Sequence, residues 1–290
     1  MRRNLGRNST LALLAMLALS GYRTSQAAPC PLASYGEFPV TQGEQGRSLM
    51  PVLVDGRPLL ASLRLENSET ESRAGLAETL GDRVFGGRNG EPAEEVANLG
   101  SIRLGALTVP NPGAVVTHAR IDGDLGLGRD VLDLVDLELD LGHGVVRLFS
   151  PKHCAGNVVY WTNEHLELPY HDGYYGPSFE AVINGHAVRA ALAPSAAATT
   201  VDPDLFALLG VSKRDGRIDL DSLEFGGIRL RHIAAEELIL RPLDGDYGAR
   251  ITATAIAEKP GVLIGADVLK RLRLFIAQGE KKIYLTVGNG

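Results

Sequence analysis

Hydrophobic and polar residues alternate along most of this chain in short runs. Residues 137–148 (LELDLGHGVVRL) and 274–285 (LFIAQGEKKIYL) each form two such runs around a glycine. Alternation of this kind is typical of β-strands that bury one face. Asp55-Gly56 and Asn184-Gly185 each separate two apolar runs, which is the strongest short-range signal for a β-hairpin. The pattern predicts an all-β protein with few short helices.

The same pattern occurs twice in the same order. From the turn glycine to a Leu-Gly pair the distance is 24 residues in both copies, Gly56 to Leu80 and Gly185 to Leu209. Later blocks repeat as well: residues 99–105 resemble 220–226, and 126–132 (GLGRDVL) resemble 263–269 (LIGADVL). Ordered repetition predicts two similar lobes from an internal duplication. Each lobe is expected to contain a hairpin, a short helix ending at Gly81 or Gly210, a second hairpin, a helical turn and a final ribbon.

The first residues differ from the rest in composition. Residues 1–27 begin with Arg2 and Arg3, continue with an apolar run at 11–19, and end in small residues at Ser25 and Ala27. This order is typical of a secretory signal peptide, with an uncleaved anchor as the alternative. We therefore expect a periplasmic or secreted protein, with no membrane span once the signal is removed.

Charge and cysteine content limit the possible functions. The formal net charge is −6, and removing residues 1–27, which hold four Arg and no acid, would make it −10. No block of basic residues suggests a nucleic-acid surface. In an oxidising compartment, Cys30 and Cys154 could form a disulfide, or they could remain two buried thiols. The seven His are scattered without metal-ligand spacing, so no metal or cofactor is expected.

The repeated order of turn, apolar strand, small-residue loop, Gly-x-Asp-Val-Leu and ribbon resembles the retropepsin-like aspartic proteases, in their exported, single-chain form. The resemblance covers about residues 48–149 and 167–287. It implies a two-lobed acid-protease-like β-barrel fold in which both lobes come from one chain, so that a monomer is possible. The expected organisation is a signal peptide at 1–27, an N-terminal lobe at 28–149, a linker at 150–166 and a C-terminal lobe at 167–290.

The catalytic positions of that family are substituted here. The resemblance places an Asp-Thr-Gly triplet after the apolar strand of each lobe, where this chain has Arg64-Leu65-Glu66 and Ala193-Pro194-Ser195. The family's reaction needs two carboxylates that share one proton, and neither Arg64 nor Ala193 supplies one. A slipped alignment would read Glu66-Asn67-Ser68 as a degenerate triplet, but it breaks the 24-residue spacing and provides only one acid. Asp130 and Asp267 recur in both copies, and we expect them to have a structural role as helix caps or ion-pair partners.

The substituted positions leave two functional interpretations. The first is a catalytically inactive protease-like protein that binds a peptide or protein in the cleft between its lobes. Arg64 would then need an anionic partner, either Glu66 or a carboxylate of the ligand. The alternative is an active aspartic-type endopeptidase, which is what the family name implies. In the first interpretation residues 84–96 would be the flap hairpin of lobe one. The candidate cleft residues are Arg64, Glu66, Asn67, Ala193 and Ser195 of the loops, with Gly87 and Arg88 of the flap.

Overall fold

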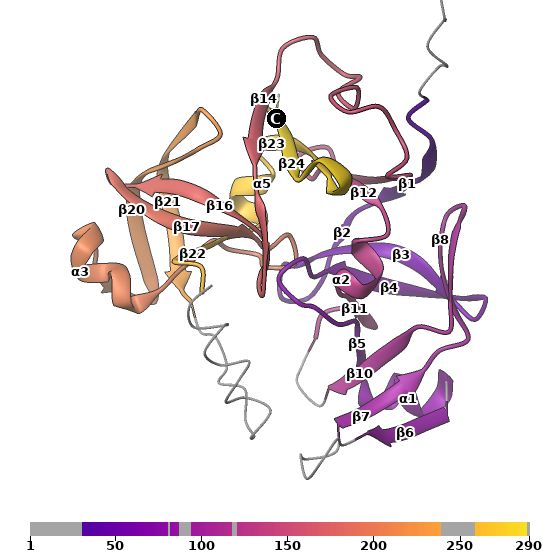
Figure 1. Ribbon diagram of the computed structural model, residues 1–290. Helices are drawn as coiled ribbons and strands as arrows, with labels where there is room; N and C mark the ends of the chain where they lie inside the picture. Colours follow the sequence, from indigo (N-terminus) through magenta and orange to yellow (C-terminus); the bar gives the residue numbers. More distant parts are fainter. Residues whose placement is uncertain (1–30, 81, 87–93, 118–120, 239–258, 289–290) are drawn as a thin grey trace, which may run out of the picture. The chain divides into compact units, whose positions relative to one another are not determined.

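The fold is mostly β-strand with a few short helices, as the hydrophobic pattern predicts (Figure 1). The structure, a computed structural model, describes residues 31–80, 82–86, 94–117, 121–238 and 259–288. The expected signal peptide, Cys30 and the flap residues Gly87 and Arg88 lie outside these residues. No helix in the described ranges is long and apolar enough to cross a bilayer.

The first lobe is built on a ten-stranded sheet. A short helix, α1 (Ala74–Leu80), follows β5, and a helical turn, α2 (Arg129–Leu132), follows β11. The strands are β2 (Thr41–Gln42), β3 (Ser48–Val54), β4 (Arg57–Leu63), β5 (Glu71–Arg73), β6 (Asp82–Gly86), β7 (Glu94–Asn98), β8 (Ser101–Leu104), β9 (Leu107–Pro110), β10 (Gly113–Thr117) and β11 (Leu125–Leu127).

The second lobe repeats this plan on an eight-stranded sheet. A 3₁₀ turn (Pro203–Leu205) leads into α3 (Phe206–Leu209), and α5 (Ala266–Leu269) is the equivalent of α2. The strands are β15 (His171–Gly173), β16 (Gly176–Ile183), β17 (His186–Leu192), β18 (Thr200–Val201), β19 (Lys213–Arg214), β20 (Arg217–Phe225), β21 (Ile228–Glu237) and β22 (Val262–Ile264).

Backbone geometry at the predicted turns agrees with the repeat. Asp55 and Gly56 have φ values of 50° and 78°, and Asn184 and Gly185 have 49° and 87°. Positive φ at both central residues is the geometry that a two-residue hairpin requires, which explains the Asp-Gly and Asn-Gly pairs. Gly210 caps α3 in the left-handed region at φ 66°, as predicted. Gly81, its predicted equivalent, lies outside the described residues.

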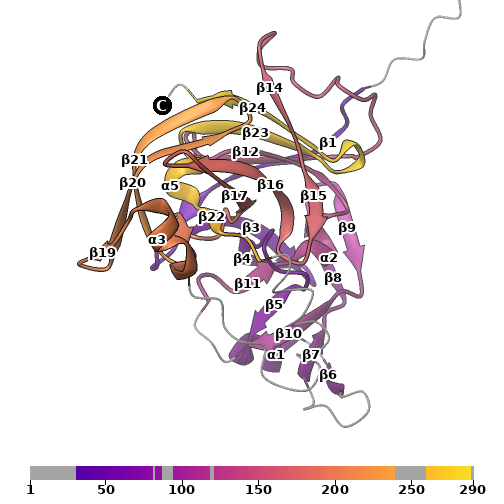
Figure 2. The same cartoon turned by 60° about the vertical axis from the view of Figure 1, so that its left-hand side comes forward.

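A six-stranded sheet joins the lobes. In order it contains β1 (Ser34–Pro39), β13 (Val145–Phe149), β12 (Asp136–Asp140), β23 (Leu272–Ala277), β24 (Lys282–Val287) and β14 (Leu166–Pro169). The predicted ribbons β12–β13 and β23–β24 are its four central strands, and Figure 2 shows β12 alongside β23.

The pairing of β12 with β23 reveals the symmetry of the duplication. Glu138 pairs with Phe275, its counterpart in the repeat, and the flanking pairs Leu137–Ile276 and Leu139–Leu274 are reciprocal. When a twofold axis relates two strands, one residue pairs with its own counterpart, and the residues on either side of it pair with each other's counterparts. A pseudo-twofold axis therefore passes between Glu138 and Phe275.

The segment between the lobes is tied to this sheet by polar contacts. Residues 150–165 form no helix or strand, yet Tyr160 donates a 2.7 Å hydrogen bond to the fully buried Glu138. Arg147 and Arg273 also lie 2.7 Å from the Glu138 carboxylate. This buried carboxylate is thus paired with two guanidinium groups, which compensates for its loss of water.

Candidate functional site

The loops that follow β4 and β17 occupy equivalent places in the two lobes. The backbone N–H of Arg64 donates to Leu127 O at 2.9 Å, and that of Ala193 donates to Ile264 O at 3.0 Å. One turn later, Asn67 N donates back to Arg64 O at 3.0 Å, and Ala196 N donates back to Ala193 O at 2.9 Å. Arg64 and Ala193 are therefore structural counterparts, and the slipped alignment through Glu66-Asn67-Ser68 is not supported.

Each loop is held by a threonine hydroxyl from its own lobe. Thr199 Oγ1 donates to Asp267 Oδ1 at 2.9 Å and accepts from the N–H of Gly265 at 3.1 Å. In lobe one, Thr70 makes the same two contacts, with Asp130 at 2.8 Å and Gly128 at 3.1 Å. Asp130 and Asp267 are structural, as expected, although their partner is a loop threonine rather than a helix cap or an ion pair.

The cation at the first loop is paired within lobe one. Arg64 Nη1 contacts Glu71 Oε2, and its Nε lies 3.6 Å from Glu66 Oε1. Asn67 Nδ2 donates to the other oxygen of Glu71 at 2.9 Å. The Arg64 side chain is 17% exposed, so its charge is compensated mainly by these two carboxylates. Of the two partners expected for Arg64, the protein itself supplies Glu66, and a ligand carboxylate is not required.

The Arg64 side chain packs within its own lobe. The described polar contacts of Arg64 are all with lobe one, and its side chain lies over Gly126, where an added Cβ would come within 2.5 Å of its Cδ. In lobe two the repeat places Leu263 at the position of Gly126, and Leu263 packs with the buried Ala193. In lobe one the long side chain of Arg64 thus lies over Gly126, whereas in lobe two the small side chain of Ala193 lies beside Leu263.

Glu66 and Ser195 meet across the lobes. Ser195 Oγ donates to Glu66 Oε1 at 2.5 Å, and these two residues are counterparts in the repeat. Like Glu138 and Phe275, Glu66 and Ser195 are equivalent residues of the two lobes that contact each other on the pseudo-twofold axis. The substitutions at the two glycine positions of the family triplet therefore create one hydrogen bond between the lobes.

Burial dominates the electrostatics of Glu66. Loss of water raises the pKa of its carboxyl above the ordinary value, while the Arg64 charge and the Ser195 hydroxyl act in the opposite direction. Glu66 Oε2 is buried, and no hydrogen-bond donor reaches it among the described residues. Glu66 is thus a desolvated single carboxyl with one oxygen occupied by Ser195.

This arrangement limits the chemistry of the two loops. Glu66 and Glu71 are the carboxylates that surround Arg64, and both belong to lobe one. The second loop, residues 193–199 (APSAAAT), contains no acid. Ser195 is only 3% exposed and its hydroxyl is engaged, so a substrate carbonyl would not reach it. These loops therefore hold neither a carboxylate dyad nor an accessible nucleophile.

Several predicted features lie at the edge of the described structure. β6 and β7 form a hairpin within the segment expected to be the flap of lobe one, but its tip with Gly87 and Arg88 lies outside the described residues. In lobe two the corresponding hairpin, β19–β20, closes through the short turn Asp215-Gly216. The Cys30–Cys154 disulfide stays a prediction, because Cys30 lies outside the described residues.

Two contacts of this region carried no sequence signal. Glu71 pairs with Arg64 from the next strand, β5, and no motif marks it. The turn between β15 and β16 lies against the first loop: Arg129 Nη2 donates to Tyr174 O at 3.1 Å, and a Cβ at Gly176 would lie 2.1 Å from Leu65 O. The comparison of Gly126 with Leu263 is the one sequence feature that could have indicated where Arg64 lies.

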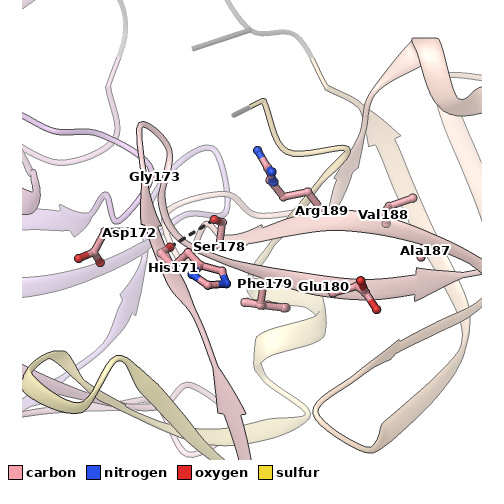
Figure 3. Close-up of a pocket in the computed structure, with 9 residues that line it drawn as sticks. All are labelled: His171, Asp172, Gly173, Ser178, Phe179, Glu180, Ala187, Val188 and Arg189. Carbon is pink, nitrogen blue, oxygen red and sulfur yellow. Dashed lines mark hydrogen bonds between the residues drawn. The ribbon is translucent and has the colours of Figure 1, made fainter. Parts of the chain in front are cut away.

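Two pockets that described residues line do not include Arg64, Glu66 or Ser195. One is formed by β15, β16 and β17 (Figure 3). The other lies between residues 161–166 and β24. Within the described ranges, no group of three His, Cys, Asp or Glu side chains is placed to hold a metal ion.

Comparison with solved structures identifies the fold. The crystal structure of the aspartic proteinase from Irpex lacteus is similar at a TM-score of 0.53 and 11% sequence identity, over 88% of this chain and 97% of that chain. At this identity the similarity shows the fold alone. No model of a protein family and no curated protein matches the sequence. The chain therefore has the two-lobed all-β fold of pepsin-like aspartic proteinases.

Proposed function

We propose that this chain is an exported, catalytically inactive relative of the retropepsin-like aspartic proteases that binds a peptide or protein segment between its lobes. The observation that carries the proposal is the pair of counterparts Arg64 and Ala193 at the ends of β4 and β17. Aspartic proteases hydrolyse peptides with two carboxylates that share a proton and hold the attacking water. A guanidinium and a methyl group supply neither function.

Glu66 does not replace the missing dyad in this proposal. It is one carboxyl, and its Oε1 already accepts the hydrogen bond from Ser195. A second carboxyl beside Arg64, that of Glu71, is bound to Arg64 on the same lobe. A nearby permanent cation opposes the sharing of a proton between two acids, because it stabilises the ionised form of both.

Peptide binding is supported by the fold and by general recognition chemistry. Extended peptides bind by pairing their backbone with strands and hairpins, and this mode needs no catalytic group. The β6–β7 hairpin contains residues of the segment expected to form the flap. The active endopeptidase is the competing interpretation, and the same experiment decides between the two.

The experiment compares the unmodified protein with a variant that restores both triplets. The restored variant carries Arg64→Asp, Leu65→Thr and Glu66→Gly in the first loop, with Ala193→Asp, Pro194→Thr and Ser195→Gly in the second. We expect the unmodified protein to cleave no peptide between pH 3 and 8, and the restored variant to gain pepstatin-sensitive cleavage. Pepstatin-sensitive cleavage by the unmodified protein, lost in Glu66→Gln, would overturn the proposal.

A further inference from the structure

A second candidate binding site lies at the edge of the six-stranded sheet that joins the lobes. β14 begins at Leu166, which pairs with Leu285, whereas β24 continues for two more residues to Val287. The chain before β14 does not follow β24 further, because Glu164 N donates to Thr162 Oγ1 at 3.2 Å instead. A pocket of about 530 Å³ lies beside the last residues of β24. This pocket is thus a gap in the row of strands.

The backbone of Val287 points into this gap. Gly288 N donates to Arg271 O at 2.8 Å, on the side of β23. Lys281 O accepts from Tyr170 N at 3.0 Å, on the side of β14. Because these directions alternate along an antiparallel strand, Val287 faces the side of β14, as Lys281 does. No other residue that the structure describes forms a backbone hydrogen bond with Val287 there.

The first lobe fills the equivalent place with its own chain. The repeat makes Ser150 the counterpart of Val287. Ser150 N donates to Ala33 O at 2.8 Å, so the segment before β1 continues alongside the end of β13. Leu32 of this segment packs against the buried cluster that contains Phe149. The fold therefore shows which ligand suits the gap of lobe two: an extended segment, antiparallel to β24, with apolar side chains.

The walls of the gap favour the same chemistry. Leu166, Leu285 and Val287 project to one face of the sheet. The side chains of Leu166 and Val287 are 41% and 63% exposed, and exposed apolar side chains that gather in one place mark interaction surfaces. Trp161 lies on the other face, where its Nε1 donates to Thr286 Oγ1 at 3.1 Å. A ligand residue opposite Val287 would project beside Leu166 and cover both exposed side chains.

His165 limits the length of the ligand that can pair here. It directly precedes Leu166 and lines the pocket, so it occupies the next position in line with β14. An added segment must therefore end, or leave the sheet, after the residue opposite Val287. Only this residue forms backbone hydrogen bonds with β24, so the affinity depends strongly on the side chain that it buries.

We propose that this gap binds an extended segment of a partner protein, which pairs antiparallel with Val287 and buries an apolar side chain against Leu166 and Val287. The site is lined by different residues from the interlobe loops, so it goes beyond the proposed function and does not rest on it.

Peptide titrations followed by tryptophan emission test this proposal, because Trp161 is the single tryptophan and lines the pocket. The probe is the acetylated, amidated peptide Ser-Thr-Pro-Leu-Val, which follows residues 31–33 (PLA) with Val in place of Ala33. We expect a saturable change in the emission of Trp161. A peptide with Ser as its last residue should bind about tenfold more weakly, because it lacks the apolar side chain. A peptide with N-methylated Val should also bind about tenfold more weakly, because it lacks the N–H that donates to Val287 O.

Protein variants test the same contacts. Val287→Pro removes a donor that forms no bond within the described sheet, and Val287→Thr keeps this donor with a side chain of the same shape. We expect Val287→Pro to bind about tenfold more weakly than Val287→Thr. Leu166→Asp places a charge on the apolar wall and should abolish binding. Leu208→Asp, at a 51% exposed leucine of α3, is the matched control and should bind as the unmodified protein does.

Three results would overturn the proposal. The first is an unchanged emission of Trp161 at millimolar peptide. The second is equal binding by the unmodified protein, Val287→Pro and Leu166→Asp, which would place the peptide elsewhere. The third is a dimer in sedimentation velocity that Val287→Pro dissociates, because a second copy of this chain would then fill the gap.

Discussion

The hydrogen bond from Ser195 to Glu66 should contribute measurably to the stability of the two-lobed fold. Ser195→Ala removes the donor that lies 2.5 Å from Glu66 Oε1, whereas Arg64 Nε remains 3.6 Å from this oxygen. Hydrogen bonds to charged groups contribute about 1.5–3 kcal/mol and those between neutral groups about 0.5–1.5 kcal/mol. We therefore expect Ser195→Ala to cost about 2 kcal/mol where Glu66 is ionised, and about 1 kcal/mol where it is protonated.

Urea unfolding followed by tryptophan fluorescence measures this cost. Trp161, the single tryptophan, stacks 4.3 Å from the Arg273 guanidinium on the sheet that joins the lobes, so its emission should report their unfolding. A double-mutant cycle of Ser195→Ala with Glu66→Leu, which removes the acceptor oxygen, isolates the pairwise contribution, which we expect to be about 1 kcal/mol or more.

Ser48 provides a matched control for this cycle. Its Oγ is buried, and no hydrogen-bond partner reaches it among the described residues, so Ser48→Ala should be neutral or slightly stabilising. The reasoning would be refuted if Ser195→Ala cost no more than Ser48→Ala. It would also be refuted by a coupling below about 0.5 kcal/mol at every pH.

Three further predictions concern pH, glycine packing and the disulfide. Burial raises the pKa of Glu66 in the folded protein, so folding takes up a proton at pH values between the unfolded and the folded pKa. The free energy of unfolding should therefore rise as the pH falls through this window. Urea titrations of Glu66→Gln should show a smaller rise, because this variant lacks the titrating carboxyl. Gly265→Ala should lower stability by about 1–3 kcal/mol, because its Cβ would lie 2.4 Å from the Ala198 backbone, whereas Gly75→Ala in α1, with nothing within 4 Å, should raise it by about 0.5–1 kcal/mol. Reducing a Cys30–Cys154 disulfide should cost up to about 4 kcal/mol, visible as a lower Tm than in the oxidised protein.

The backbone of both lobes was predictable because local signals and the repeat agree. Positive φ at Asp55 and Asn184 follows from residue types that tolerate this conformation, and each is followed by glycine. The ungapped 24-residue spacing identified Arg64 and Ala193 as counterparts, and the backbone hydrogen bonds place them so. Local chemistry thus determined where the candidate loops begin.

Side-chain contacts at these loops were less predictable. The sequence indicated that Arg64 needs an anionic partner, but the direction of Arg64 depends on the space over Gly126 and on Glu71 of another strand. Glu66 was recognised as a partner of Arg64, whereas its hydrogen bond to Ser195 depends on how the lobes pack. Contacts across a pseudo-twofold axis leave no signal in the local pattern of either lobe.

The most direct test of the account is the fate of peptides that the protein binds. A defined peptide mixture is incubated with the unmodified protein from pH 3 to 8, and bound and free peptides are then identified by mass spectrometry, with and without pepstatin. The account predicts that peptides are retained with their full masses, because the second loop, residues 193–199, contains no acid and presents the Ser195 hydroxyl to Glu66. Products of internal cleavage that disappear with pepstatin would contradict it.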